Sequence, residues 1–249
     1  MAETRTPIIS FKNFSFQYRA QKQPTLHDIN LDIYPGERVL IAGPSGSGKS
    51  TASKLAARFW DADSGSITLG GVDVKTVEPE TLFKNYAIVF QDVMLFDESV
   101  MENIRLGRGD ATDEEVMAAA RAAQCEEFIK RLPQGYQTVV TADGANLSQG
   151  QRQLLAIARA AVASPPVLVL DEATSSIDTR TEKLIEKGMD ALMDGRTVFV
   201  IAHRLSTVRN ADAIMVLEHG KIVERGSHQE LLAQKGIYYR LYHGMLELS

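Results

Sequence analysis

The residues best suited to chemistry form a glycine-rich run that ends in lysine and serine. The run follows the apolar segment Val39 to Ala42 and precedes a segment with apolar residues at helical spacing. It fits the pattern G-x-x-x-x-G-K-[ST], in which backbone N–H groups turn toward a polyanion, the lysine reaches the outer phosphates and the hydroxyl binds Mg²⁺. The pattern predicts a nucleoside-triphosphate site formed by Gly43, Pro44, Ser45, Gly46, Ser47, Gly48, Lys49, Ser50 and the adjoining Thr51.

Two carboxylates follow a second apolar segment, Val167 to Leu170. Asp171 and Glu172 would lie at the carboxyl end of a buried strand, where α/β proteins place their ligand sites. Asp171 suits Mg²⁺, directly or through water, and Glu172 is positioned to polarise an attacking water. The structural alternative is that both carboxylates cap the next helix.

The pentapeptide Leu147-Ser148-Gln149-Gly150-Gln151 is more specific. It resembles the signature of the ATP-binding-cassette (ABC) family, which normally reads Leu-Ser-Gly-Gly-Gln, and Gln149 departs from it at a position that is often variable. The resemblance implies that Ser148 and Gly150, with Gln151 beside them, contact the γ-phosphate held by a second subunit. Ser148 could also cap the helix that we expect from Gln151 to Val162, and the two roles are compatible.

Further residues match the family in the expected order. Tyr18 resembles the aromatic residue that stacks on adenine, with Phe16 as the rival and a core aromatic as the structural alternative. Asp178 resembles the aspartate of the D-loop. The resemblance implies MgATP as the bound nucleotide, a catalytic set of Glu172, His203, Gln91 and Lys49, and magnesium ligands Ser50, Gln91 and Asp171.

Two segments resemble those of exporters within the ABC family. Phe90 to Phe96 and Ala202 to Thr207 are similar to the C-terminal domains of fused exporters, whereas Ile9 to Thr51 resembles the ATPases of vitamin and cobalt importers equally well, as in a mosaic or engineered chimera. The family implies an ATP-induced head-to-tail dimer, with a like or an unlike cassette, that hydrolyses ATP to power transport through a transmembrane domain. The alternatives are a chimeric ATPase without a transport partner and a non-transport cassette protein.

Strand, turn and helix patterns describe the elements that must position these residues. Short apolar strands alternate with helices after residue 163, as in a parallel sheet with crossover helices, and Ile8 to Tyr18 has the composition of a strand. Thr112-Asp113-Glu114-Glu115 is a helix start that opens an alanine-rich helix from Val116 to Ile129. We expect one α/β domain over 1–249: a P-loop NTPase core lobe (1–91 and 164–249) with an antiparallel β portion, and a helical subdomain at about 92–163.

Composition and charge indicate the class of protein, its location and the partners that we exclude. The 249 residues are 44% hydrophobic and 24% charged, as in soluble globular proteins. The longest apolar stretches are far below the ~20 residues of a spanning helix, and the opening residues lack a signal pattern, so we expect a cytoplasmic chain that works at the cytosolic face of a membrane when bound to its partner. A net charge of −5 disfavours nucleic acid as a partner.

Overall fold

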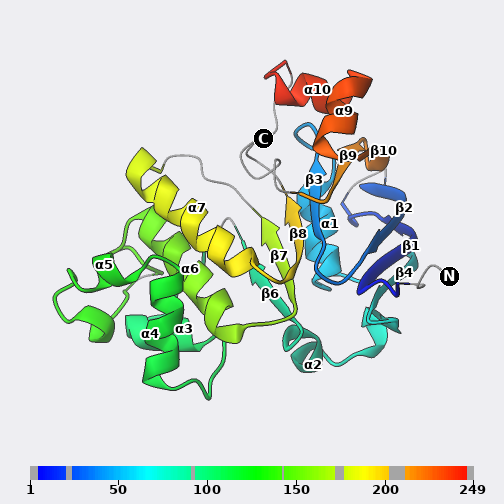
Figure 1. Ribbon diagram of the computed structural model, residues 1–249. Coiled ribbons are helices and arrows are strands. Elements are labelled where there is room, and N and C mark those ends of the chain that lie inside the picture. Colours follow the sequence, from blue (N-terminus) through cyan, green and yellow to red (C-terminus); the bar gives the residue numbers. More distant parts are fainter. Residues whose placement is uncertain are drawn as a thin grey trace. The chain divides into compact units, whose positions relative to one another are not determined.

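The computed structural model describes residues 5–20, 24–90, 93–141, 143–171, 177–201 and 211–245. Two compact units make up the chain (Figure 1). The first contains Met1–Tyr86, Val167–Glu172 and Arg196–Ser249, and the second contains Ala87–Pro166 and Ala173–Gly195. The mixed α/β architecture agrees with the P-loop ATPase fold expected from the sequence.

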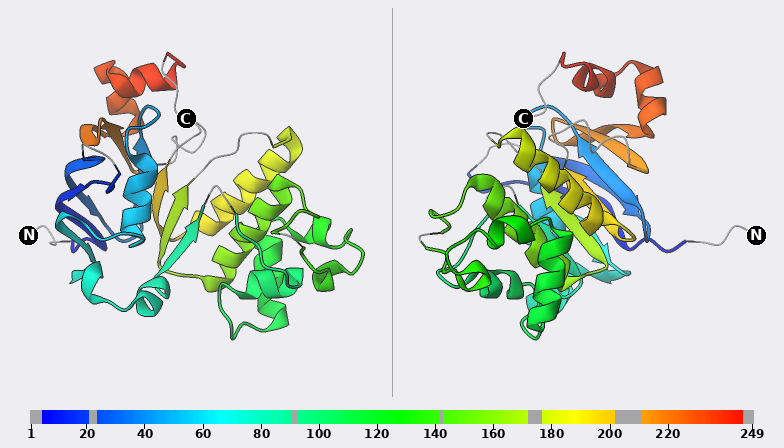
Figure 2. Two further views of the ribbon diagram at one scale, coloured as in Figure 1. Left: turned by 180° about the vertical axis from the view of Figure 1, so that it is seen from behind. Right: turned by 60° about the vertical axis from the view of Figure 1, so that its left-hand side comes forward.

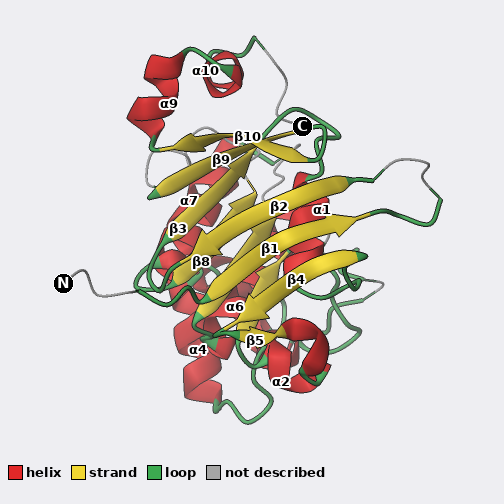
Figure 3. Cartoon of the chain, turned by 90° about the vertical axis from the view of Figure 1, so that its right-hand side faces the viewer, coloured by secondary structure: helices red, strands yellow, loops and turns green. Residues whose placement is uncertain are grey.

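The first unit carries a four-stranded antiparallel sheet, which Figure 3 shows nearly face on. Its order is β2-β1-β4-β5, with β1 (Ile9–Phe16), β2 (Leu26–Ile33), β4 (Ser64–Leu69) and β5 (Val72–Asp73). Ile9 pairs with Ile33 on one side and with Leu69 on the other. The apolar residues of β1 are buried, and a register shift between Phe11 and Phe14 interrupts the alternation of its side chains.

A six-stranded sheet has the order β10-β9-β3-β8-β7-β6. Its members are β3 (Arg38–Ala42), β6 (Tyr86–Val89), β7 (Val167–Asp171), β8 (Thr197–Ile201), β9 (Ala213–Glu218) and β10 (Lys221–Gly226). Strands β7, β8, β3 and β9 run parallel, and β10 returns antiparallel to β9. The parallel strands are almost wholly buried, as the continuous apolar runs predict.

Helices of the first unit flank these sheets. They are α1 (Lys49–Ala56), the 3₁₀ turn η1 (Val74–Thr76), α2 (Pro79–Phe83), α9 (His228–Gln234) and α10 (Ile237–Tyr242). Helix α1 packs on β7 and β8. It therefore joins the glycine-rich loop that precedes it to the parallel strands.

The second unit is mainly helical (Figure 2). It contains α3 (Val100–Arg105), α4 (Asp113–Ala122), α5 (Glu126–Ile129), the 3₁₀ turn η2 (Gly135–Gln137), α6 (Gln149–Ala163) and α7 (Thr179–Met193). Helix α6 packs against α3, α4 and α7. Its buried face includes Leu154, Ile157 and Ala158, which follow the helical period.

Two details differ from the sequence expectations. The helix expected from Val116 to Ile129 is divided into α4 and α5, because Gln124 adopts a positive φ of 62° between them. Helix α7 groups with the helical unit, whereas we expected it in the core lobe; it packs closely on α6 and brings Gly188 against Ala123. Among the described residues, no helix has the length and apolarity needed to cross a membrane.

Candidate functional site

The glycine-rich run forms the loop between β3 and α1, as the motif predicts. Helix α1 begins at Lys49, directly after Gly48, whose φ of 103° is a left-handed conformation that favours glycine. A Cβ on Gly48 would also lie 2.8 Å from Leu26 Cδ2. The loop therefore delivers its backbone N–H groups to the N-terminus of a helix, which is where an anion binds favourably.

Lys49 is buried beneath this loop. Its ammonium group donates hydrogen bonds to the carbonyl oxygens of Gly43 at 2.8 Å and Pro44 at 3.0 Å. Burial lowers the pKa of Lys49 to about 8, and the Asp171 carboxylate opposes that shift. A cation held partly desolvated in this way gains strongly from a phosphate.

Ser47 supplies a further sign that the loop fits an anion. Its hydroxyl oxygen is buried and has no hydrogen-bond partner within the described ranges. An unsatisfied buried hydroxyl is costly, and a phosphate oxygen would accept its hydrogen bond. The loop residues thus suit a triphosphate, with Ser50 directly after Lys49 at the start of α1.

Asp171 ends β7 at the same level of the sheet as the end of β3. It pairs with Ile201 of β8, and Ile201 pairs with Ile41 of β3. The carboxylate is therefore two strands from the start of the glycine-rich loop Gly43 to Ser50, here named the phosphate loop, and its influence on the pKa of Lys49 reflects this proximity. Buried carboxylates are stabilised by cations, and the Asp171 carboxylate and the Ser50 hydroxyl offer the oxygen ligands that Mg²⁺ prefers.

Tyr18 is half-buried just after β1. Its hydroxyl lies 3.2 Å from the Thr51 hydroxyl on α1, and its ring meets Phe16 edge-on with centroids 4.9 Å apart. Phe16, the rival candidate for the base, is 5% exposed and lies in the core. Of these two candidates, Tyr18 is the more accessible, and its hydroxyl contacts α1.

Ser148 is the N-cap of α6. Its hydroxyl accepts a hydrogen bond from the Gln151 N–H at 3.2 Å, while the Gln151 side chain accepts one from the Ser148 N–H at 2.9 Å. This reciprocal pair is a capping box. Ser148 itself is exposed, so its surface is open to a second molecule. Gly150 is buried, and a Cβ there would lie 2.3 Å from the Thr181 Cγ2 of α7.

Asp178 caps α7 in a similar way. Its carboxylate accepts hydrogen bonds from the N–H groups of Arg180 and Thr181 at 3.1 and 3.0 Å. These bonds hold the pKa of Asp178 below its usual value, and the bonds from Thr181 have the largest effect. Asp178 is exposed, like Ser148 in the same unit.

Three expected residues, Gln91, Glu172 and His203, lie outside the described residues. The first unit brings together Tyr18, Thr51, the phosphate loop and Asp171, and the second carries Ser148, Gly150, Gln151 and Asp178. Sequence reasoning missed two neighbours of the first group. Trp60 meets the Tyr18 ring, and Gly220 donates to the phosphate loop. Neither contact has a local sequence signal, because the partners are far apart in the chain.

Comparison with known proteins identifies the family of the chain. A model of the family described as ABC transporter matches residues 26–175. The "Uncharacterized ABC transporter ATP-binding protein YfiC" of Bacillus subtilis is 47% identical over 243 residues, which are 98% of this chain and 40% of that protein. The "ATP-dependent lipid A-core flippase" of Pasteurella multocida is 48% identical over 236 residues, 94% of this chain and 40% of that protein.

A solved structure is similar over nearly the whole chain. The "Structure of a bacterial Atm1-family ABC exporter with ATP bound" superposes with a TM-score of 0.88 at 42% identity, covering 98% of this chain and 42% of that one. The chain thus spans about two-fifths of the length of these relatives. Because the family model covers more than half of the chain, the chain belongs to the ABC transporter family and is an ATPase domain of that family.

Proposed function

We propose that the chain binds MgATP and hydrolyses it to ADP and phosphate in order to drive export by a membrane transporter. The observation that carries this proposal is the buried ammonium of Lys49, held under a glycine-rich loop at the start of α1 and close to Asp171. Such an arrangement stabilises negative charge on a nucleotide's outer phosphates. Tyr18 would bind the base, and Gly43 to Thr51 would bind the phosphates.

Ser50 and Asp171 would hold Mg²⁺, with Gln91 as a third ligand from outside the described residues. When bound, the ion neutralises the charge that develops on the phosphates. We assign Glu172 as the base that orients the attacking water and His203 as the contact to the γ-phosphate. These two roles rest on the family motif, in which Glu172 directly follows the carboxylate that ends β7.

Two chains would complete two sites. Ser148 and Asp178 are exposed at the starts of α6 and α7, and the glycine-rich loop belongs to the other unit. We infer that Ser148, Gly150, Gln151 and Asp178 of one chain contact the nucleotide held by a second chain. A two-fold arrangement lets one surface serve both sites.

The transport partner is a transmembrane domain, in keeping with relatives whose names describe a flippase and an exporter. The chain would work at the cytosolic face of that membrane. An apolar surface suited to such a partner lies in the second unit, where Met94 and Phe96 are 69% and 53% exposed. Asn103 and Arg159 fix this segment through hydrogen bonds to its backbone.

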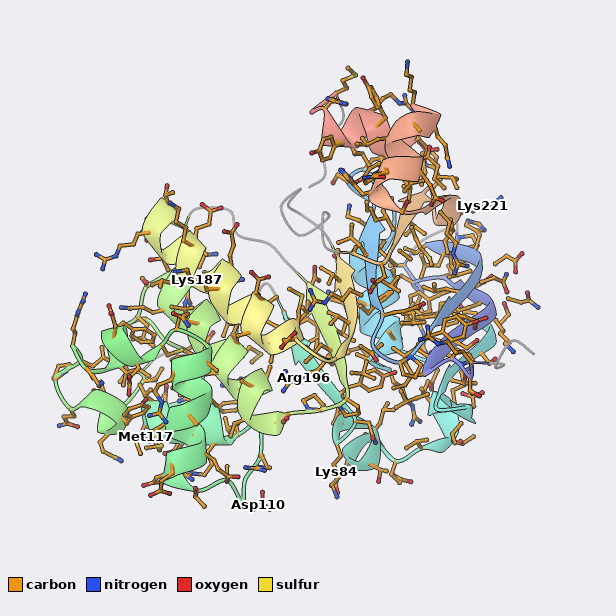
Figure 4. The ribbon with its side chains drawn as sticks, viewed as in Figure 1. Lys84, Asp110, Met117, Lys187, Arg196 and Lys221 are labelled. Carbon is orange, nitrogen blue, oxygen red and sulfur yellow. The ribbon has the colours of Figure 1, made fainter. Side chains whose placement is uncertain are left out.

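The test is steady-state ATP hydrolysis by the purified chain. We expect Mg²⁺-dependent activity that Glu172→Gln lowers by about 10²- to 10⁴-fold, because general-base loss has this effect, with ATP binding retained. Lys84→Ala is the matched control, since Lys84 is an exposed residue next to α2 (Figure 4). Hydrolysis by the Glu172 variant within about twofold of the parent would contradict the assignment. Hydrolysis without any response to a reconstituted exporter membrane domain would favour the partnerless alternative.

A further inference from the structure

The only tryptophan of the sequence, Trp60, lies beside the aromatic residue expected to bind the base. It follows the end of α1 and is 42% exposed. Its ring centroid is 5.2 Å from that of Tyr18 and the two planes cross at 86°. Phe16 meets the same tyrosine at 85°, and the Phe16 and Trp60 centroids are 6.2 Å apart. The three rings form a cluster, Phe16–Tyr18–Trp60, in which both contacts of the Tyr18 ring have the favourable edge-to-face geometry and the Phe16–Trp60 pair is tilted at 38°.

The cluster fixes the Tyr18 ring while leaving part of its surface accessible. The Thr51 hydroxyl holds the far end of the ring at 3.2 Å. Tyr18 lines an open pocket of about 280 Å³ together with Phe16, Arg19 and Pro24. Trp60 is not among the described residues that line this pocket. Trp60 therefore contacts Tyr18 from outside this pocket.

We propose that Trp60 is a positioning residue that preorganises Tyr18 for the purine base of the nucleotide. The proposal rests on the function proposed above and adds a residue that acts through Tyr18. A ring held in place before binding loses less conformational freedom when the base stacks on it, so affinity for the base rises. Phosphate binding depends on Lys49 and the loop at the start of α1, so it does not require Trp60.

A spectroscopic consequence follows from the single tryptophan. All intrinsic tryptophan emission of the chain comes from Trp60, 5.2 Å from the proposed base platform. A base that stacks on Tyr18 changes the surroundings of the indole, whereas a ligand with phosphates and no base leaves them unchanged. MgATP should therefore alter the emission, and magnesium tripolyphosphate should not.

The experiment measures the affinity of both ligands by calorimetry in the Glu172→Gln background, which prevents turnover. We expect Trp60→Ala to weaken MgATP binding by about three- to tenfold, from the usual value of an edge-to-face aromatic pair, and to leave tripolyphosphate affinity within about twofold. Trp60→Phe keeps an aromatic ring and should restore MgATP affinity to within about twofold. The matched control is Phe83→Ala, which removes an exposed aromatic side chain from α2 and should bind both ligands like the parent.

Other outcomes overturn the proposal. An equal loss of both ligands in Trp60→Ala would assign Trp60 to general stability of α1, and unchanged MgATP affinity would show that Tyr18 needs no support. An emission change with tripolyphosphate as large as that with MgATP would also contradict a base-specific role. If the parent bound tripolyphosphate and MgATP equally, Tyr18 would not be a base platform, and if it bound neither, the proposed function itself would fail.

Discussion

Gly220 donates its backbone N–H to the carbonyl oxygen of Ser47 at 3.1 Å, so a hairpin turn supports the phosphate loop. The turn joins β9 to β10, and the Gly220 carbonyl accepts a hydrogen bond from the His27 N–H at 2.7 Å. A Cβ on Gly220 would lie 2.4 Å from the Thr25 carbonyl oxygen, and its φ is 74°. The close approach of three chain segments therefore requires glycine.

Gly220→Ala should weaken MgATP binding by displacing the turn from the phosphate loop. The alanine methyl group cannot occupy its position without movement of the turn or of Thr25, and positive φ adds strain of about 1 kcal/mol. We expect a loss of affinity of about tenfold, equivalent to ~1.4 kcal/mol, in equilibrium titration.

Lys221→Ala is the matched control for this turn. Lys221 follows Gly220 at the start of β10 and is exposed (Figure 4). It should bind MgATP like the parent. Equal affinities for Gly220→Ala and Lys221→Ala would show that the phosphate loop keeps its conformation without the turn.

The lowered pKa of Lys49 predicts that ATP affinity depends on pH. Below about pH 8 the free chain carries the ammonium form, and bound phosphates stabilise that form and raise its pKa. As pH rises through about 8, free chains lose the proton and binding must recover it, so the dissociation constant should increase by up to about tenfold per pH unit. Calorimetry between about pH 7 and 9.5, in buffers of different ionisation enthalpy, would measure the proton uptake.

Lys49→Arg provides the comparison, because arginine stays charged throughout this range. It should bind more weakly than lysine at neutral pH, since the guanidinium does not match the loop carbonyls, but its affinity should not change with pH. A parent chain whose affinity also stayed constant above pH 8 would place the ionisation elsewhere.

The phosphate loop and the start of α6 could be predicted from sequence because their signals are local. Strand, glycines and Lys-Ser occur consecutively, so the position of Lys49 at the start of α1 follows from the motif. The capping box of Ser148 and Gln151 spans one helical turn and is likewise readable.

Contacts between distant segments could not be predicted in this way. Trp60 meets Tyr18, and Gly220 meets Ser47, only after the sheets have formed. The end of α4 at Ala122 could not be predicted either, because no glycine or proline marks it. The residue with a left-handed conformation after this helix is Gln124. Close packing of α7 on α6 placed α7 in the helical unit although its own sequence resembles any crossover helix.

Asn103 should be essential for the local stability of the segment that carries Met94 and Phe96. It is fully buried; its side chain accepts from the Phe96 N–H at 2.9 Å and donates to the carbonyl oxygens of Phe96, Glu98 and Ser99. Asn103→Ala leaves these groups unsatisfied, at a cost of about 2–4 kcal/mol. We expect amide hydrogen exchange at Phe96 to accelerate by about tenfold or more.

Asn85→Ala is the matched control, because within the described ranges the Asn85 side chain makes a single hydrogen bond, to the Thr81 carbonyl oxygen at 3.0 Å. It should leave exchange at Phe96 unchanged. Equal protection of Phe96 in the parent and in Asn103→Ala would show that the segment is held by Arg159 alone, through the Met94 carbonyl oxygen.

Ser148 allows the proposed dimer to be tested separately from the folding of α6. Both Ser148→Ala and Ser148→Arg remove the hydroxyl that caps the helix, at a cost of ~1 kcal/mol, so they share the same local defect. They differ in size and charge on an exposed surface.

In the Glu172→Gln background, which keeps ATP from being consumed, we expect the parent and Ser148→Ala to be monomers alone and dimers with MgATP, as measured by light scattering. Bound ATP supplies charged contacts to both chains, and ligand linkage then favours association. Ser148→Arg should bind ATP in its own phosphate loop yet remain monomeric, because the long side chain occupies the space of the facing nucleotide. A dimer in Ser148→Arg would remove the signature from the interface, whereas a monomeric parent at saturating MgATP would require an unlike cassette as the partner.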